Sequence, residues 1–278
     1  MKFNLSSELS YDVYAPTTFV FNIQAEASAT QKILEESITI TPTIPFQEFV
    51  IEGVRFIKLK AEAGVPFTIL YKATVEVQHT IVNEAMLLRK IPIIEFAPEI
   101  LPYLFPSRHC QSDKLEKLAN KEFGNIKDDY SKVIAINSWI FNNIDYISGT
   151  TDSGTSAYDT LIQRQGVCKD FAHLGIGLCR ALHIPARYFT GYAYQLYPPD
   201  FHACFEAYIG GHWIIFDSTG LVPINGLVKI ANGKDAAEVA VANFFGNTFC
   251  TYMNIQCNAA ETFLPFIASQ DSMEAIAY

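Results

Sequence analysis

The sequence lacks several features that would place it in a familiar class. No run of about 18 apolar residues is present, so we expect no membrane span. The N-terminal stretch MKFNLSSELSYDVY contains no apolar region followed by a small-residue cleavage site, so no secretory signal is visible. The six cysteines include no CxxC pair. Without an export signal, we expect reduced thiols and a cytoplasmic location.

Basic residues are also few. The 20 lysines and arginines are outnumbered by 29 aspartates and glutamates, which gives a formal net charge of −9. Because phosphate backbones are bound by clusters of basic residues, we expect no nucleic-acid partner. Hydrophobic residues, by contrast, make up 50% of the chain, so a real core can form. The length of 278 residues suits two modest domains or one large one.

The first 95 residues alternate between apolar and polar side chains at many positions. The segments 19–24, 57–62 and 71–78 each show this period of two. Such alternation is typical of strands that expose one face to solvent. Pro and Gly residues separate the segments. We therefore predict an antiparallel β-sandwich domain over residues 1–95, in which no catalytic constellation is visible.

The pattern changes after a proline-rich stretch. Four prolines between positions 92 and 106 interrupt regular structure and indicate a domain boundary near residue 95. The segments 113–123 and 128–143 then carry apolar residues at helical spacing. We predict an α+β domain over residues 96–278.

The segment GVCKDFAHLGIGLCRALHIP, residues 166–185, carries a cysteine at a chemically useful place. Its apolar residues recur every three or four positions, which predicts an amphipathic helix that ends before Pro185. Cys168 would then lie in the first turn of this helix. There the unpaired N–H groups and the helix dipole favour a thiolate over a thiol, and the thiolate is the nucleophile.

An activated cysteine needs a base, and the base needs a group that orients it. The segment HACFEAYIGGHWIIFD, residues 202–217, supplies both types of residue. Gly210-Gly211 predicts a tight turn between two antiparallel strands, so paired positions sum to about 421. His202 would lie opposite a position near 219, two residues from Asp217 on the same face of the sheet. The imidazole and the carboxylate can therefore meet.

These two motifs, in this order, resemble the transglutaminase-like superfamily, specifically prokaryotic members that carry the label of cysteine proteases. The flanking stretches YLFPSRHCQSDKL and LVKIANGKDAAEVAVAN resemble segments before and after the catalytic domain of those proteins, so the likeness spans roughly residues 103–245. The resemblance implies a papain-like fold, in which a helix with the cysteine packs on an antiparallel sheet. It also implies a catalytic triad of Cys168 as nucleophile, His202 as base and Asp217 as orienter.

Neither the resemblance nor the residues fix the reaction. Our first hypothesis is a cysteine protease or amidase that hydrolyses a peptide or side-chain amide bond through an acyl-enzyme on Cys168. Transglutaminase-type acyl transfer to an amine is the second, and a catalytically silent domain that binds a peptide or partner is the third. The backbone N–H of Cys168 is one candidate oxyanion donor, and Tyr158 or Gln163 is a candidate for another. The expected partner is a peptide or protein, and the oligomeric state is open.

Several neighbouring residues have plainer interpretations. We predict the other five cysteines to be structural, since cysteine is often a small buried hydrophobe. Five residues rotate a helix by about 140° net, so we expect His173 to point away from the thiol and to pack against the sheet. A zinc site from His202, Cys204 and His212 has no clear fourth ligand, so we expect no metal and no cofactor. We expect the polar loop 148–156 to lie near the site.

Overall fold

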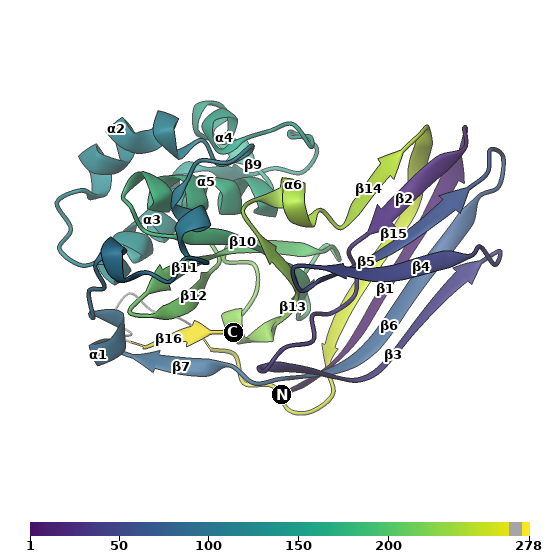
Figure 1. The fold of residues 1–278 in the computed structure, drawn as a ribbon, viewed down its shortest axis with the longest axis horizontal. Helices are drawn as coiled ribbons and strands as arrows, with labels where there is room; N and C mark the ends of the chain where they lie inside the picture. Colours follow the sequence, from purple (N-terminus) through teal and green to yellow (C-terminus); the bar gives the residue numbers. More distant parts are fainter. Residues whose placement is uncertain (267–273) are drawn as a thin grey trace.

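The computed structural model describes residues 1–266 and 274–278, and it consists of two parts placed side by side (Figure 1). One part is a β-sandwich of two four-stranded antiparallel sheets, with strand orders β15-β1-β6-β3 and β14-β2-β5-β4. The strands of the sandwich are Lys2–Val13 (β1), Thr17–Phe21 (β2), Gln31–Thr41 (β3), Phe46–Ile51 (β4), Val54–Ala61 (β5), Phe67–Val77 (β6), Ala242–Phe245 (β14) and Thr248–Ala259 (β15).

The alternation of apolar and polar side chains in the N-terminal sequence produces the core of this sandwich. Along β6, every second residue from Phe67 to Val77 is buried and most of the residues between them are partly exposed. Phe19 and Phe21 of β2 are fully buried and stack at 5.6 Å between ring centroids. Because strand side chains alternate between faces, the aromatic and β-branched residues of both sheets meet in one apolar layer.

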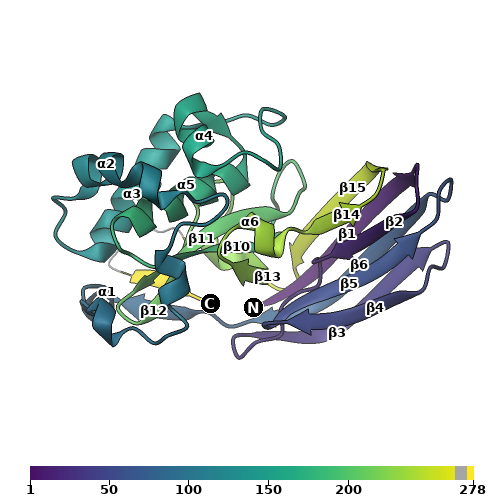
Figure 2. The ribbon, with the colours of Figure 1, turned by 45° about the horizontal axis from the view of Figure 1, so that its top comes forward.

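The second part combines helices with a six-stranded sheet of order β13-β10-β11-β12-β16-β7. Figure 2 shows α2, α3, α4 and α5 gathered over one side of this sheet. The elements of this part are Thr80–Asn83 (β7), Glu84–Leu87 (α1), Ile93–Glu95 (η1), Leu101–Leu104 (η2), Ser112–Phe123 (α2), Asp129–Asn143 (α3), Asp145–Tyr146 (β8), Ala157–Gln163 (α4), Gln165–Gly166 (β9), Cys168–Ala181 (α5), Ala186–Ala193 (β10), His202–Ile209 (β11), His212–Phe216 (β12), Ile224–Gly226 (η3), Leu227–Gly233 (β13), Ala236–Val239 (α6) and Glu274–Ala277 (β16).

The helices expected from apolar periodicity are confirmed as α2, α3 and α5, and the mixed fold with antiparallel sheets agrees with the predicted class. Within the described part of the chain, no helix is both long enough and apolar enough to cross a membrane.

The two parts exchange strands across the expected boundary near residue 95. Strand β7 joins the six-stranded sheet, where it pairs with β16. Strands β14 and β15 return from the C-terminal half and pair with β2 and β1. A boundary at residue 95 therefore divides the sequence but does not separate the strands of the two parts. Antiparallel pairing joins segments that are far apart in the chain.

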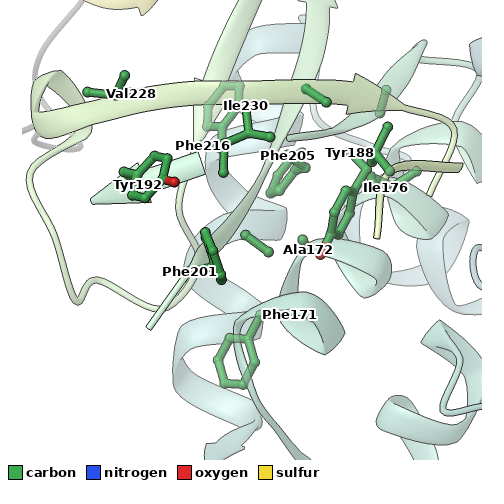
Figure 3. Close-up of a cluster of buried hydrophobic side chains, with 14 of the residues drawn as sticks. Phe171, Ala172, Ile176, Tyr188, Tyr192, Phe201, Phe205, Phe216, Val228 and Ile230 are labelled. Atoms are coloured by element: carbon green, nitrogen blue, oxygen red, sulfur yellow. The ribbon is translucent and has the colours of Figure 1, made fainter. Parts of the chain in front are cut away.

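A close approach of α5 to the six-stranded sheet sets the position of this helix. A Cβ atom added to Gly175 would lie 2.6 Å from the ring of Phe205 on β11. Phe205 in turn stacks on Phe216 of β12 at 5.4 Å between ring centroids, and Figure 3 shows Phe205 between Phe216 and the α5 residues Ala172 and Ile176. Only a glycine lets the helix backbone come this near to a fixed ring.

We predict that Gly175→Ala destabilises the fold by about 1–3 kcal/mol, because the new methyl group overpacks against a ring that cannot move away. Gly177→Ala is the matched control: its Cβ would meet the flexible end of Leu115 at 2.6 Å, and it receives the same gain in helix propensity of about 1 kcal/mol. Urea unfolding of both variants measures the difference. Equal midpoints would show that the approach at Gly175 imposes no constraint.

Candidate active site

Cys168 is the first residue of α5, as the sequence predicts. The helix entrance is held by Asp170, a buried carboxylate that accepts hydrogen bonds from the backbone N–H of Val167 at 2.9 Å and from the Thr151 hydroxyl at 2.7 Å. Asp170 thereby satisfies one of the donors that a helix leaves unpaired at its start. The Cys168 side chain is partly exposed and lines a pocket.

The hairpin of β11 and β12 has the register that its sequence predicts. Ile209 pairs with His212 on either side of Gly210-Gly211, whose φ values are both positive. His202 begins β11, and Asp217 directly follows β12. The Nε2 atom of His202 lies 3.0 Å from Oδ2 of Asp217, and both side chains are almost fully buried. Two of the three predicted residues are therefore hydrogen-bonded to each other.

Burial and charge act in opposite directions on this pair. Burial alone would lower the pKa of His202, but the Asp217 carboxylate, together with Cys204 and Cys168, outweighs it and raises that pKa well above the usual value. Burial would raise the pKa of Asp217, but His202 and Thr219 hold it below its ordinary value. Both the backbone N–H and the hydroxyl of Thr219 donate to Oδ1 of Asp217, at 2.8 and 2.7 Å. The pair therefore favours an imidazolium beside a carboxylate.

Both Cys168 and Cys204 lie near the His202 imidazole. Its Nδ1 atom makes no hydrogen bond of standard geometry with any described residue. The Cys168 thiol nevertheless lies close enough to contribute to the raised pKa of the imidazole. Such contacts between a nucleophile and its base often tighten only when substrate binds.

Tyr146 lies at the same helix entrance and was not anticipated from the sequence. Strand β8 pairs in parallel with β9, which sets Tyr146 opposite Gly166. Burial and the Cys168 thiol raise the pKa of Tyr146 to about 12, although His202 and a hydrogen bond from the Cys168 backbone N–H oppose this. The phenol therefore stays protonated at neutral pH, beside the backbone N–H of Cys168.

The two residues suggested from the sequence as oxyanion donors lie elsewhere. Tyr158 and Gln163 are exposed residues of α4, and neither lines the pocket beside Cys168. The ammonium group of Lys114 lies over the Tyr158 ring at 5.3 Å. The structure thus brings Cys168, His202 and Asp217 together but keeps Tyr158 and Gln163 apart from them.

The pocket beside Cys168 and His202 has a volume of about 520 Å³. Its lining includes loop residues Thr151 to Thr155, as expected for the polar loop, and residues from the segment 236–243. This volume falls in the range of small-molecule and peptide side-chain sites. The site is therefore accessible to a substrate.

Two buried histidines form the inner end of the pocket. His109 and His173 stack face to face, 5.0 Å between ring centroids, and both line the pocket. Burial and the neighbouring His109 ring lower the pKa of His173 to about 3, so it is neutral, and its Nε2 accepts a hydrogen bond from the Ala236 N–H. His173 lines the pocket because the pocket extends along α5 beyond its first turn. Its ring also packs on Tyr188 of β10, 5.1 Å between ring centroids, which agrees with the expected packing against the sheet.

Cys204 lies near the His202–Asp217 pair. The ligand atoms of His202, Cys204 and Asp217 all lie within 4.8 Å of one another. Burial and Asp217 raise the pKa of Cys204 to about 12, so it remains a neutral thiol. A metal ion here would have to displace the hydrogen bond between imidazole and carboxylate, so the expectation of no metal stays a prediction. His212 lies at the other end of the hairpin.

We predict that Asp217→Asn lowers the pKa of His202, because it removes the charge that opposes burial. The imidazolium would then lose its proton at a lower pH. NMR titration of the imidazole resonances measures the shift, with His202→Asn to assign the signal. Thr219→Val keeps the carboxylate and should shift the pKa much less. An unchanged titration in Asp217→Asn would show that this carboxylate does not set the protonation of His202.

Comparisons with known proteins agree with this geometry. Residues 116–218 match the family described as the transglutaminase-like superfamily, and residues 1–99 match the bacterial transglutaminase N-terminal domain. A crystal structure from Cytophaga hutchinsonii, of a protein provisionally named a cysteine protease, is 55% identical, with a TM-score of 0.98 over 100% of this chain and 97% of that one.

Curated relatives share shorter regions. An uncharacterised protein of Mycobacterium leprae is 30% identical over 162 residues, which is 55% of this chain and 57% of that protein. One of Mycobacterium tuberculosis is 31% identical over 117 residues, or 37% of each. The chain thus spans between about a third and a little over half the length of these relatives. The family matches and the full-length structural likeness together show that this chain belongs to the transglutaminase-like superfamily.

Proposed function

We propose that the protein hydrolyses a peptide or side-chain amide bond through an acyl-enzyme on Cys168. One observation carries the proposal: Cys168 shares an accessible pocket with His202, whose far nitrogen is hydrogen-bonded to the buried Asp217. A thiol, a base and a group that orients the base form the arrangement that nucleophilic acyl chemistry requires.

The proposed reaction has two halves. The Cys168 thiolate attacks the carbonyl carbon, and as the C–N bond breaks, the His202 imidazolium gives its proton to the departing nitrogen. A water molecule then attacks the thioester while His202 takes one of its protons. The C–S bond breaks, and the carboxylic acid leaves with the thiol site restored. Asp217 stabilises the imidazolium and fixes which nitrogen faces the thiol.

Negative charge on the attacked oxygen needs donors placed in advance. We assign this role to the hydroxyl of Tyr146 and to the backbone N–H of Cys168, which would exchange its hydrogen bond to Tyr146 for one to the charged oxygen. Since the phenol keeps its proton at neutral pH, it can donate when the charge develops. Tyr146 thus replaces Tyr158 and Gln163 in our proposal.

The acyl-enzyme would also permit transfer to an amine, which differs only in the second nucleophile. Membership of the transglutaminase-like superfamily supports this second candidate. Hydrolysis remains the first choice, since water is always available.

We predict that iodoacetamide labels Cys168 much faster than the other cysteines at pH 6–7. Four of the others are buried, and Cys250 is the exposed internal control. Burial raises the pKa of Cys250, so little of it is thiolate at that pH. Peptide mapping by mass spectrometry gives the rates. Equal labelling of Cys168 and Cys250 would support the catalytically silent alternative.

We predict that turnover of a peptide library falls by about 10⁴-fold or more in Cys168→Ala, as is typical when a nucleophile is removed. Cys250→Ala is the matched control and should keep full activity. Adding a primary amine such as dansylcadaverine separates the reactions: hydrolysis leaves only acids, whereas transfer incorporates the dye. Activity that survives Cys168→Ala would rule out the proposed nucleophile.

A further inference from the structure

The outer edge of β14 continues directly from the pocket. Ala242 and Asn243 line the pocket with Cys168, and they are the first two residues of β14. In its sheet β14 is the outermost strand and pairs only with β2 among the described residues. The residues Asn243–Phe245 are exposed. A backbone edge therefore begins inside the active-site pocket and runs onto the sandwich.

The register tells which backbone groups of β14 point outward. The N–H of Asn22 donates to the carbonyl of Val241 at 2.9 Å, and the ladder keeps that register, with Ala242 opposite Phe21. In an antiparallel pair, bonded and non-bonded positions alternate. Asn243 therefore faces β2 with both of its backbone groups, whereas Ala242 and Phe244 direct theirs to the free edge.

This free edge lacks the usual protection against pairing. Outer strands are commonly guarded by charged residues or proline, and β3 on the other side of the sandwich carries Lys32, Glu35 and Glu36. The sequence of β14 is ANFF, with no charge and no proline. Phe244 is 49% exposed and Phe245 is 68% exposed. An uncharged edge with exposed aromatic rings is suited to a partner strand.

We propose that this edge binds the substrate polypeptide as an added β-strand, which leads an extended segment into the Cys168 pocket. This inference rests on the proposed function and names its substrate class: an extended polypeptide segment, not a small amide. The outward N–H and C=O groups of Ala242 and Phe244 would bond to the peptide backbone, as in other cases of strand addition. The four residues of β14 would span about 13 Å of peptide.

The residues around the edge predict which side chains the bound segment would carry. Val239, Val241 and Ala242 give the pocket lining an apolar part next to the edge, while Thr151 and Asp152 give it a polar part. Because strand side chains alternate, the segment would place apolar side chains toward the apolar part and polar ones toward the polar part. The β-sandwich, through β14, thereby becomes part of the substrate site.

Binding can be measured without catalysis in the Cys168→Ala protein. A positional-scanning library of blocked, dye-labelled decapeptides supplies the probe, and fluorescence anisotropy gives Kd. We expect N-methylation of the best peptide at alternate positions to weaken binding at least tenfold, because methylation removes a main-chain donor. Binding that is insensitive to N-methylation at every position, or no binding by any library peptide, would overturn the proposal.

A second arm alters the protein. Ala242→Pro removes an outward N–H and leaves the β2 ladder intact, so we expect at least a tenfold loss of affinity. Val50→Pro is the matched control, since Val50 is exposed on the outer strand β4, at the opposite end of the same sheet. Thermal melts check that both variants fold. A wild-type dimer that Ala242→Pro dissociates would instead assign the edge to a second copy and overturn the proposal.

Different results would refute the strand-addition site and the proposed hydrolysis. If Ala242→Pro leaves both affinity and peptide turnover unchanged in otherwise wild-type protein, the strand-addition site is wrong while the hydrolase stands. If the edge binds peptide but the protein with Cys168 turns over none, the binding site stands and the proposed hydrolysis fails.

Discussion

The hydrogen bond between His202 and Asp217 is the interaction on which the rest of the site depends. Both side chains are buried, so water cannot take the place of a missing partner. Removal of one partner from a buried charged pair typically lowers the stability of the fold by about 3–5 kcal/mol. Thr219 saturates the other carboxylate oxygen. The imidazole is thus held in one orientation, and its Nδ1 atom has no hydrogen-bond partner of standard geometry among the described residues.

Two features of the fold position α5 and its entrance. Gly175 lets α5 approach Phe205 of β11, the same strand that begins with His202. The parallel pairing of β8 with β9 then brings Tyr146 to the entrance of α5. Helix, hairpin and short bridge are packed elements, so they hold the candidate catalytic groups in one part of the fold. The strand exchange also helps to build the site, since β14 supplies residues that line the pocket and pairs with β2 of the sandwich.

Local signals in the sequence predicted the parts that local rules control. The apolar period located α5 and hence Cys168, and Gly210-Gly211 fixed the register that brings His202 to Asp217. Tyr146 could not be found in this way, because its neighbour Gly166 is joined to it by a two-residue bridge with no sequence signature. The stacked His109 and His173 also escaped prediction, since one comes from a loop and the other from a helix.

The sequence did not predict that β14 and β15 pair with strands of the sandwich, for a related reason. Pairing between Ala242 and Phe21 joins positions more than two hundred residues apart, and nothing in either segment specifies its partner. Alternation predicts that a strand forms and which face is buried, but not which strand lies next to it. The boundary near residue 95 followed from composition, whereas sheet order follows from packing.

The most direct test of the account is covalent capture of the nucleophile by an electrophilic peptide, such as a peptidyl vinyl sulfone, followed by intact-mass measurement and peptide mapping. The account predicts a single adduct on Cys168, whose formation slows sharply in folded His202→Asn protein. An adduct on a different cysteine, or an undiminished rate without the imidazole, would contradict it.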